Sequence, residues 1–307
     1  NNAGLIYHDT FRRFDRSAPL FRLAMNRASA NPLGYVSLQV ALLDAGRPAA
    51  SLDSVEVEFR QRFPGHARLW EAKALALWAH GRLDSLEALS RGARRTARNS
   101  RQELQSLTWL RAVASLQGHS REARELATET AMARARATRP GASAAELSAQ
   151  AAMEIAKEDA TLAIVFDGDD VRARALLKQA TSKTAVDRVP AGDRDWRDLA
   201  FVAALAGDAE AGRIINEGYM RDLMPVDADR IVWAPRVRAS AAIAADRWDE
   251  GLADLALIAK VQAVPYLEDA FLAGIAHERA GRPDSAIVWY ERAVSRNDSE
   301  RLGAGLF

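Results

Sequence analysis

Apolar and polar residues follow each other along the chain with the period of an amphipathic helix, and short polar turns interrupt this pattern. Alanine, leucine, arginine and glutamate dominate the periodic segments, and all four favour helix. No useful length of the chain alternates as a strand does. We therefore predict an all-α fold in which neighbouring helices pack antiparallel, because the turns are short. The predicted helices span residues 19–30, 33–45, 48–62, 66–80, 83–97, 101–117, 120–138, 142–165, 169–184, 193–206, 208–222, 227–245, 247–262, 266–280 and 283–296.

A recurring turn divides these helices into pairs. Its best copy reads ERAGRPDSA at residues 278–286. Successive copies are 35, 37, 50, 39, 39 and 35 residues apart, and a period of about 34 to 40 residues is typical of stacked helix pairs. Such stacking predicts an open ribbon with a long binding surface. The copies centre on Gly46, Gly81, Gly118, Gly207 and Gly281, with weaker copies at Gly168 and Asp246.

Residues 267–300 resemble a tetratricopeptide repeat, a helix pair of about 34 residues. That family has small residues at positions 8, 20 and 27, and a large one at position 24. Here these positions hold Gly274, Ala286, Ala293 and Tyr290. The resemblance implies that the small residues let two helices cross closely, and that Tyr290 fills the gap to the next helix. It also implies a right-handed α-solenoid of antiparallel helix pairs.

The resemblance extends unevenly over what we expect to be a single domain, residues 1–307. It is better over residues 66–135 and 193–300. Residues 1–65 and 136–190 match the repeat poorly, and the step of 50 residues falls in the second of these regions. We therefore expect the repeats to be degenerate at the N-terminus and in the middle, where the repeat geometry should break.

Composition excludes several kinds of chemistry. The chain has no cysteine, which rules out disulfides and thiolate metal sites. No two histidines have the spacing of a helical zinc site, and the acids of residues 166–170 suit a helix N-cap better than a calcium loop. Phosphate-binding glycine loops and nucleophile elbows are missing as well. We therefore expect a protein that is not an enzyme and has no metal, no cofactor and no catalytic residues.

Charge is spread unevenly although the net charge is +1. Residues 1–150 hold 22 basic and 14 acidic side chains, a net +8, and residues 151–307 hold 20 and 27, a net −7. A dipolar molecule of this kind can orient a charged partner during docking. The alternative is that the difference reflects drift between repeats and has no function.

Four of the five arginines within residues 90–101 form the strongest local charge signal. They occur at i, i+3, i+4 and i+7, so that a helix would place them on one face. This face could meet an acidic protein or an anionic lipid surface. Nucleic acid is less favoured, because no aromatic residues alternate with the arginines. A solvated outer helix is the alternative without function. The four are Arg91, Arg94, Arg95 and Arg98.

The resemblance also implies a concave surface lined by positions 2, 5, 9 and 12 of each first helix. Arginine mixed with aromatic residues suits a protein-binding surface, although tryptophans in such arrays also fill the core between helices. We take as partner-binding candidates the following residues at these positions: Arg68, Glu71, Trp78, Arg194, Arg197, Phe201, Trp233, Arg236 and Phe271. Leu75, Ala204, Ser240, Ile243, Glu268, Ile275 and Glu278 occupy the remaining ones.

These observations favour a non-catalytic scaffold for protein–protein interaction. A chain without cysteine that starts at Asn1 and not at methionine fits an exported, periplasmic or otherwise extracytoplasmic protein; a cytoplasmic location is the alternative. We expect an accessory or stabilising subunit of a larger bacterial assembly, such as a photosynthetic or respiratory membrane complex. No apolar run reaches the roughly 20 residues needed to cross a bilayer. The alternative function is a sensor or effector region of a larger regulator, such as a kinase or transcription factor.

Overall fold

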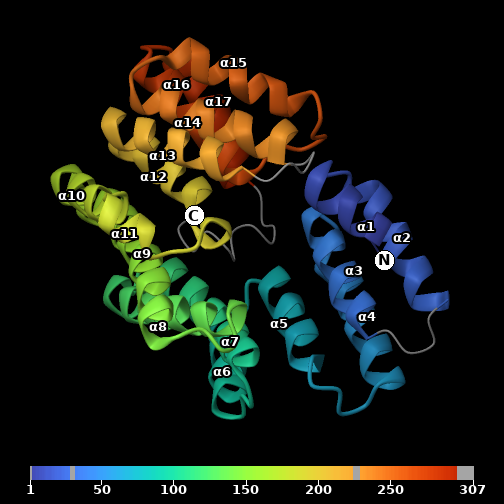
Figure 1. The fold of residues 1–307 in the computed structure, drawn as a ribbon. Coiled ribbons are helices and arrows are strands. Elements are labelled where there is room, and N and C mark those ends of the chain that lie inside the picture. The colour runs from blue at the N-terminus through green and yellow to red at the C-terminus, as the bar shows by residue number, and fades with distance from the viewer. Residues whose placement is uncertain (1, 28–31, 224–228, 296–307) are drawn as a thin grey trace.

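The computed structural model describes residues 2–27, 32–223 and 229–295, and within these ranges all regular structure is helical (Figure 1). The α-helices are α1 Asn2–Leu5, α2 Phe14–Arg27, α3 Leu33–Asp44, α4 Ala49–Arg62, α5 Leu69–Ala79, α6 Leu83–Arg95, α7 Ser100–Leu116, α8 Ser120–Thr138, α9 Ala144–Leu162, α10 Asp170–Ala180, α11 Lys183–Asp187, α12 Trp196–Ala206, α13 Ala209–Asp222, α14 Ala234–Ala244, α15 Trp248–Ala259, α16 Leu267–Arg279 and α17 Pro283–Val294. Short π-helical segments are η1 Ile6–Thr10, η2 Ala163–Asp167 and η4 Asp229–Trp233, and η3 Ala191–Asp193 is a 3₁₀ turn.

The recurring turn has one backbone geometry at all the predicted positions. Each turn residue has a φ between 58° and 74°, the left-handed region that favours glycine. The residue after it then donates its N–H to a carbonyl five residues back, as Arg282 does to His277 at 2.8 Å, which closes the helix end. At Gly168 the bond reaches six residues back, to Ala163, because η2 is π-helical. The predicted turns, including Asp246, are confirmed, and the irregular one lies in the middle.

Helix boundaries differ from the prediction mainly near the N-terminus. No helix was predicted before residue 19, yet α1 and η1 lie there, and α2 begins at Phe14 with Pro19 inside it. A proline removes a single backbone donor, and the preceding turn is already fixed by the N–H groups of Arg16 and Ser17 on the carbonyl of Arg13. Residues 169–184 form two helices, α10 and α11. The predicted helix ends at 28–30, 227–228 and 296 lie outside the described residues.

The pair α16 and α17 shows why small residues recur at fixed positions. Ala286 and Ala293 are buried, as predicted. A Cβ added to Gly274 would lie 2.4 Å from Cε1 of Tyr290, so the helices touch there. Tyr290 therefore fills the space against Gly274 and lies 5.3 Å from the ring of Phe271 in its own pair. The predicted contact of Tyr290 with the next helix falls on residues after 295 and lies outside the described residues.

Replacing Gly274 with alanine should destabilise the protein by about 1–3 kcal/mol, because the added methyl overpacks the contact with Tyr290. Gly92, in α6, is the matched control, since the nearest atom to its added Cβ is 3.9 Å away. Gly92→Ala should leave stability unchanged or raise it by up to about 1 kcal/mol through helix propensity. Urea unfolding followed by circular dichroism measures both. Equal effects of the two substitutions would contradict the close crossing.

Helices that are neighbours along the chain make the most extensive contacts, for example α7 with α8 and α16 with α17. The array curves so far that the N-terminal helices come to lie beside the C-terminal ones (Figure 1). The prediction of an open ribbon is therefore wrong. We call the junction of residues 9–12 with residues 262–266 the end contact. Its hydrogen bonds run from the Tyr266 hydroxyl to the Asp9 carbonyl (2.8 Å), from Gln262 Nε2 to the Thr10 carbonyl (3.1 Å), from the Ala263 N–H to the Phe11 carbonyl (3.0 Å) and from Arg12 Nε to the Val264 carbonyl (2.8 Å).

Candidate interaction site

A pocket of 280 Å³ opens between α3, α5, α7 and α8. Its walls are mostly aliphatic, with one tryptophan, and two charged side chains stand among the lining residues. We call it the α3–α7 groove. The lining residues are Val36, Val40, Glu71, Leu75, Leu104, Gln105, Thr108, Trp109 and Arg134.

The groove is built from the same positions of three successive repeats. Val36, Glu71 and Thr108 are 35 and 37 residues apart, the same separations as the first three recurring turns. Val40 and Leu75 form a second such row. The groove is therefore formed by the regular stacking of the helices, and no irregular loop is among the described segments that line it. Glu71 was among the predicted partner-binding residues, and Leu75 occupies another of the implied concave positions.

The charged residues of the groove are already paired inside the protein. Arg68 holds Glu71 through Nε at 2.9 Å and Nη2 at 2.5 Å, and Glu71 is buried. Arg134 Nη1 lies 3.0 Å from Oε1 of Glu154. Because these charges neutralise each other, the groove offers aliphatic and aromatic walls with two neutral polar groups, Gln105 and Thr108.

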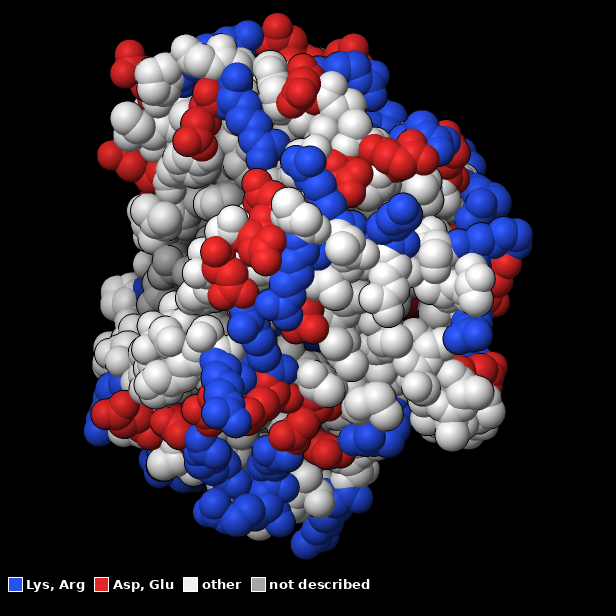
Figure 2. All heavy atoms as spheres, turned by 90° about the vertical axis from the view of Figure 1, so that its left-hand side faces the viewer, with Lys and Arg blue, Asp and Glu red and all other residues white. Residues whose placement is uncertain are grey.

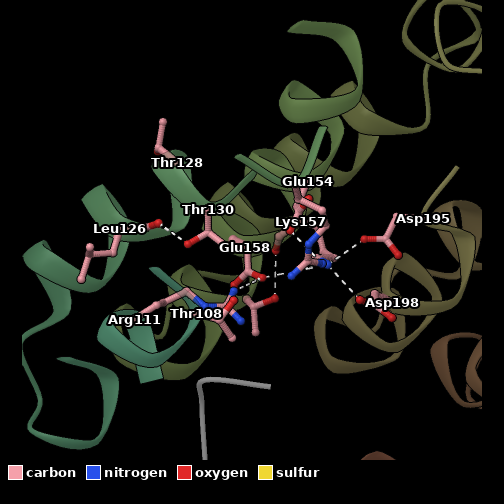
Figure 3. Close-up of polar contacts among 12 residues, drawn as sticks. Thr108, Arg111, Leu126, Thr128, Thr130, Glu154, Lys157, Glu158, Asp195 and Asp198 are labelled. Atoms are coloured by element: carbon pink, nitrogen blue, oxygen red, sulfur yellow. Dashed lines mark hydrogen bonds and ion pairs between the residues drawn. The ribbon is translucent and has the colours of Figure 1, made fainter. Parts of the chain in front are cut away.

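A charged cluster around the buried Lys157 links α7, α9 and α12 beside the groove (Figure 3). Lys157 of α9 lies between two carboxylates at the start of α12, with Nζ 2.7 Å from Asp195 and 2.8 Å from Asp198. Arg111 of α7 binds Glu158 of α9 at 2.5 Å. The cluster lies where the repeat spacing departs from its usual length, and it ties the two halves of the array together.

Burial and mutual charge set the protonation of this cluster. Burial alone would lower the pKa of Lys157, but the surrounding carboxylates, Asp195 first, outweigh it and raise that pKa. Burial and the neighbouring Asp198 raise the pKa of Asp195 to about 6. Burial also acts to raise the pKa of Asp198, yet Lys157 overcomes it and keeps that pKa below its usual value. At neutral pH the lysine is therefore charged and held by its acids.

An alternating stack of arginines and aromatic rings runs through the C-terminal half to the end contact. The rings of Trp233 and Tyr266 each lie between two arginines, whose guanidinium carbons are 4.1 to 4.4 Å from the ring centre. Cation–π attraction acts at this distance. The structure thus brings together three predicted residues, Arg197, Trp233 and Arg236, that the sequence could not place next to one another. In order, the stack is Arg197, Trp233, Arg236, Tyr266, Arg12 and Phe14.

Several other predicted partner-binding residues are occupied inside the fold. Arg236 is only 2% exposed and binds Asp269 through two hydrogen bonds of 2.5 and 2.6 Å. Arg194 binds Asp222 at 2.7 Å. The remaining buried candidates pack against other rings, since first helices that cross closely bury the side chains between them. These are Trp78, with its ring 6.0 Å from that of Trp109, and Phe201, 6.3 Å from the partly buried Phe271.

The predicted basic face does not form as expected. Helix α6 ends at Arg95, so Arg98 lies in the turn before α7 and outside that face. Arg91 binds Glu87 and Glu122, and Arg94 binds Glu129. Within the described ranges, Arg95 and Arg98 are exposed and make no ion pair. Of the four arginines, only Arg95 thus remains on the face of α6 without an ion pair among the described residues, because α8 supplies acids that the sequence of α6 does not reveal.

Basic side chains are concentrated in one part of the molecular surface. Figure 2 shows basic side chains gathered at the lower end of the molecule, where the N-terminal half lies, and mixed with acids over the rest of that face.

Trp78, Trp109 and Trp196 are buried, and the other four tryptophans are partly buried. The tryptophans therefore serve mainly as core between helices.

Asp169 caps α10 by accepting the N–H of Arg172 at 2.9 Å, as its N-cap interpretation predicted. Among the residues described, no group of three or more potential metal ligands comes together. Each described helix is too short or too polar to span a bilayer.

In comparisons with known proteins, the sequence matches no protein-family model and no curated protein.

Proposed function

We propose that this protein is a non-catalytic scaffold that holds a segment of a partner protein in the α3–α7 groove. One observation carries the proposal: equivalent positions of three successive repeats line a single apolar pocket. A surface repeated at regular spacing suits an extended chain better than a compact small molecule. The scaffold would then act by binding, with its stability supplied by the helices behind the groove.

The proposal includes a tetratricopeptide-like architecture, a right-handed solenoid of antiparallel helix pairs whose ends meet. The uniform left-handed turns and the close crossing at Gly274 support it. It also includes the expectation that the partner belongs to a larger bacterial assembly, on which this protein is an accessory subunit outside the cytoplasm. Co-purification from the native source, followed by mass spectrometry, addresses that part.

The groove specifies the chemistry of its occupant. Its acid and its base are each paired within the protein, at Glu71 with Arg68 and at Arg134 with Glu154. A charged side chain of the partner would therefore find no free counter-ion there. A bulky apolar side chain gains about 1.5–3 kcal/mol when it is fully buried. We propose that the bound segment inserts such a side chain against Leu75 and Trp109.

A pair of matched substitutions tests the groove. Val40 lines it and Val57 lies exposed on α4, away from it. Peptides selected from a phage-displayed library on the wild-type protein should carry bulky apolar residues. They should lose at least about tenfold in affinity for Val40→Arg, equal to about 1.4 kcal/mol, and bind Val57→Arg normally. Calorimetry measures the affinities. Selected peptides that bind the two variants equally well would contradict the proposal.

A further inference from the structure

We propose that the end contact is a latch: residues 9–12 fasten the two ends of the array, and their release opens the ring for entry of a partner chain. The entry of a partner rests on the proposed function, whereas the opening is a property of the fold alone. Consecutive helices are joined by whole helix faces. The latch, in contrast, is a short segment held largely through single side chains and backbone carbonyls. Such a junction opens at lower cost than a packed helix pair.

Arg12 is the central residue of the latch. It is 3% exposed and lies between two rings, 4.1 Å from the centre of Tyr266 and 5.0 Å from that of Phe14. Its Nε donates to the carbonyl of Val264 at 2.8 Å. Its φ of 49° is uncommon for a residue with a side chain. The segment therefore adopts a conformation that is disfavoured by itself and is held in place by contacts across the junction.

His8 connects the latch to the groove. Its Nδ1 lies 2.7 Å from Asp9, and its Nε2 lies 2.9 Å from Asp44 at the end of α3. Asp44 is one turn beyond the groove residue Val40 on the same helix. From α2, the rings of Phe14 and Phe21 pack against His8, at 5.1 and 6.4 Å. The position of residues 9–12 thus depends on a protonated imidazole clamped between an acid of η1 and an acid of a groove helix.

The charge on His8 gives the latch a pH dependence with a definite sign. Burial lowers the pKa of His8, but the carboxylates of Asp44 and Asp9 outweigh it and raise that pKa to about 9. The arrangement in which Asp9 and Asp44 clamp His8, and so hold residues 9–12 in place, therefore binds the proton more tightly than an arrangement in which this clamp is broken. Its advantage is complete below the ordinary histidine pKa of about 6.5 and is lost as the pH rises through about 9. The latch is closed at neutral pH.

Distance measurement between spin labels tests the latch directly, because the chain has no cysteine and two can be introduced. Arg16→Cys on α2 and Lys260→Cys beside the end contact report the junction, and both positions are exposed. Lys260→Cys with Asp284→Cys is the reference pair within the C-terminal half. The wild-type background should show one narrow, short junction distance at pH 7. Arg12→Ala should add a longer, broad population, whereas Arg13→Ala, at the exposed next position, should not.

The same distances measured at different pH values test the latch even if Arg12→Ala fails to fold. In the wild-type background the long junction distance should grow between pH 7 and pH 10, while the reference distance stays constant. His8→Gln should remove that pH dependence. An unchanged narrow junction distance in folded Arg12→Ala, or in the wild-type protein at pH 10, would overturn the latch. These distances need no peptide, so their failure is separate from a failure of the groove substitutions.

Discussion

Asp269→Ala should destabilise the protein by about 3–5 kcal/mol, the usual loss when one partner of a buried ion pair is removed. The reason is the guanidinium that remains. Arg236 is 2% exposed and Asp269 5%, and two short hydrogen bonds join them. Burial acts to lower the pKa of Arg236, yet Asp269 outweighs it and raises that pKa, so the arginine stays charged inside the protein. Without Asp269, Arg236 keeps only the weaker attraction of the half-buried Glu268 among the acids that the structure describes around it.

Asp249→Ala is the matched control for Asp269→Ala. Asp249 also pairs with an arginine, Arg282 at 2.7 Å, but its side chain is 79% exposed. Exposed pairs contribute little to stability because water screens them, so this substitution should leave the unfolding midpoint nearly unchanged. Guanidinium unfolding of both variants measures the difference. If Asp269→Ala were as stable as Asp249→Ala, the buried pair would have no role in holding α14 against α16.

The pair of Arg236 and Asp269 also shows where sequence reasoning failed. The resemblance to a tetratricopeptide repeat implies a concave position for Arg236, and on that basis we predicted that it binds a partner. Its true counter-ion is 33 residues away on the next first helix. Other arginines find acids at nearly the same distance along the chain: Arg94 and Glu129 are 35 residues apart, and Arg136 and Glu103 are 33. Opposite charges one repeat apart are thus a signal that could have identified these internal pairs.

The repeating turns could be predicted because their chemistry is local. A left-handed residue after a helix needs glycine or a tolerant substitute, and the sequence shows this at each step, even where Asp246 replaces glycine. The end contact could not be predicted in this way. It joins Arg12 to Val264, 252 residues away, and no periodic pattern around residues 9–12 indicates what they touch. The curvature that brings them together is the sum of small rotations at every helix pair.

Lys157→Met should cost about 1–3 kcal/mol at pH 7, since it leaves two acids of α12 without their lysine. The loss is smaller than the roughly 3–5 kcal/mol of a fully buried pair, because water screens the side chains of Asp195 and Asp198, which are 29% and 47% exposed. The loss should shrink as the pH falls. Asp195 already has a pKa raised to about 6, and removal of Lys157 raises it further. An acid with a raised pKa favours the folded state at low pH and opposes it as the pH rises through that pKa. The deficit should therefore be smaller at pH 5 than at pH 7.

Lys183→Met provides the comparison for Lys157→Met. Lys183 also pairs with an aspartate, Asp187, but its side chain is 87% exposed. Its replacement should leave stability unchanged at both pH values, because an exposed pair loses little when one member is removed. Urea unfolding at pH 5 and pH 7 gives the four values required. A deficit for Lys157→Met that is the same at both pH values would show that the lysine stabilises the junction of α9 and α12 by packing alone, and that the charge of Asp195 has no part in it.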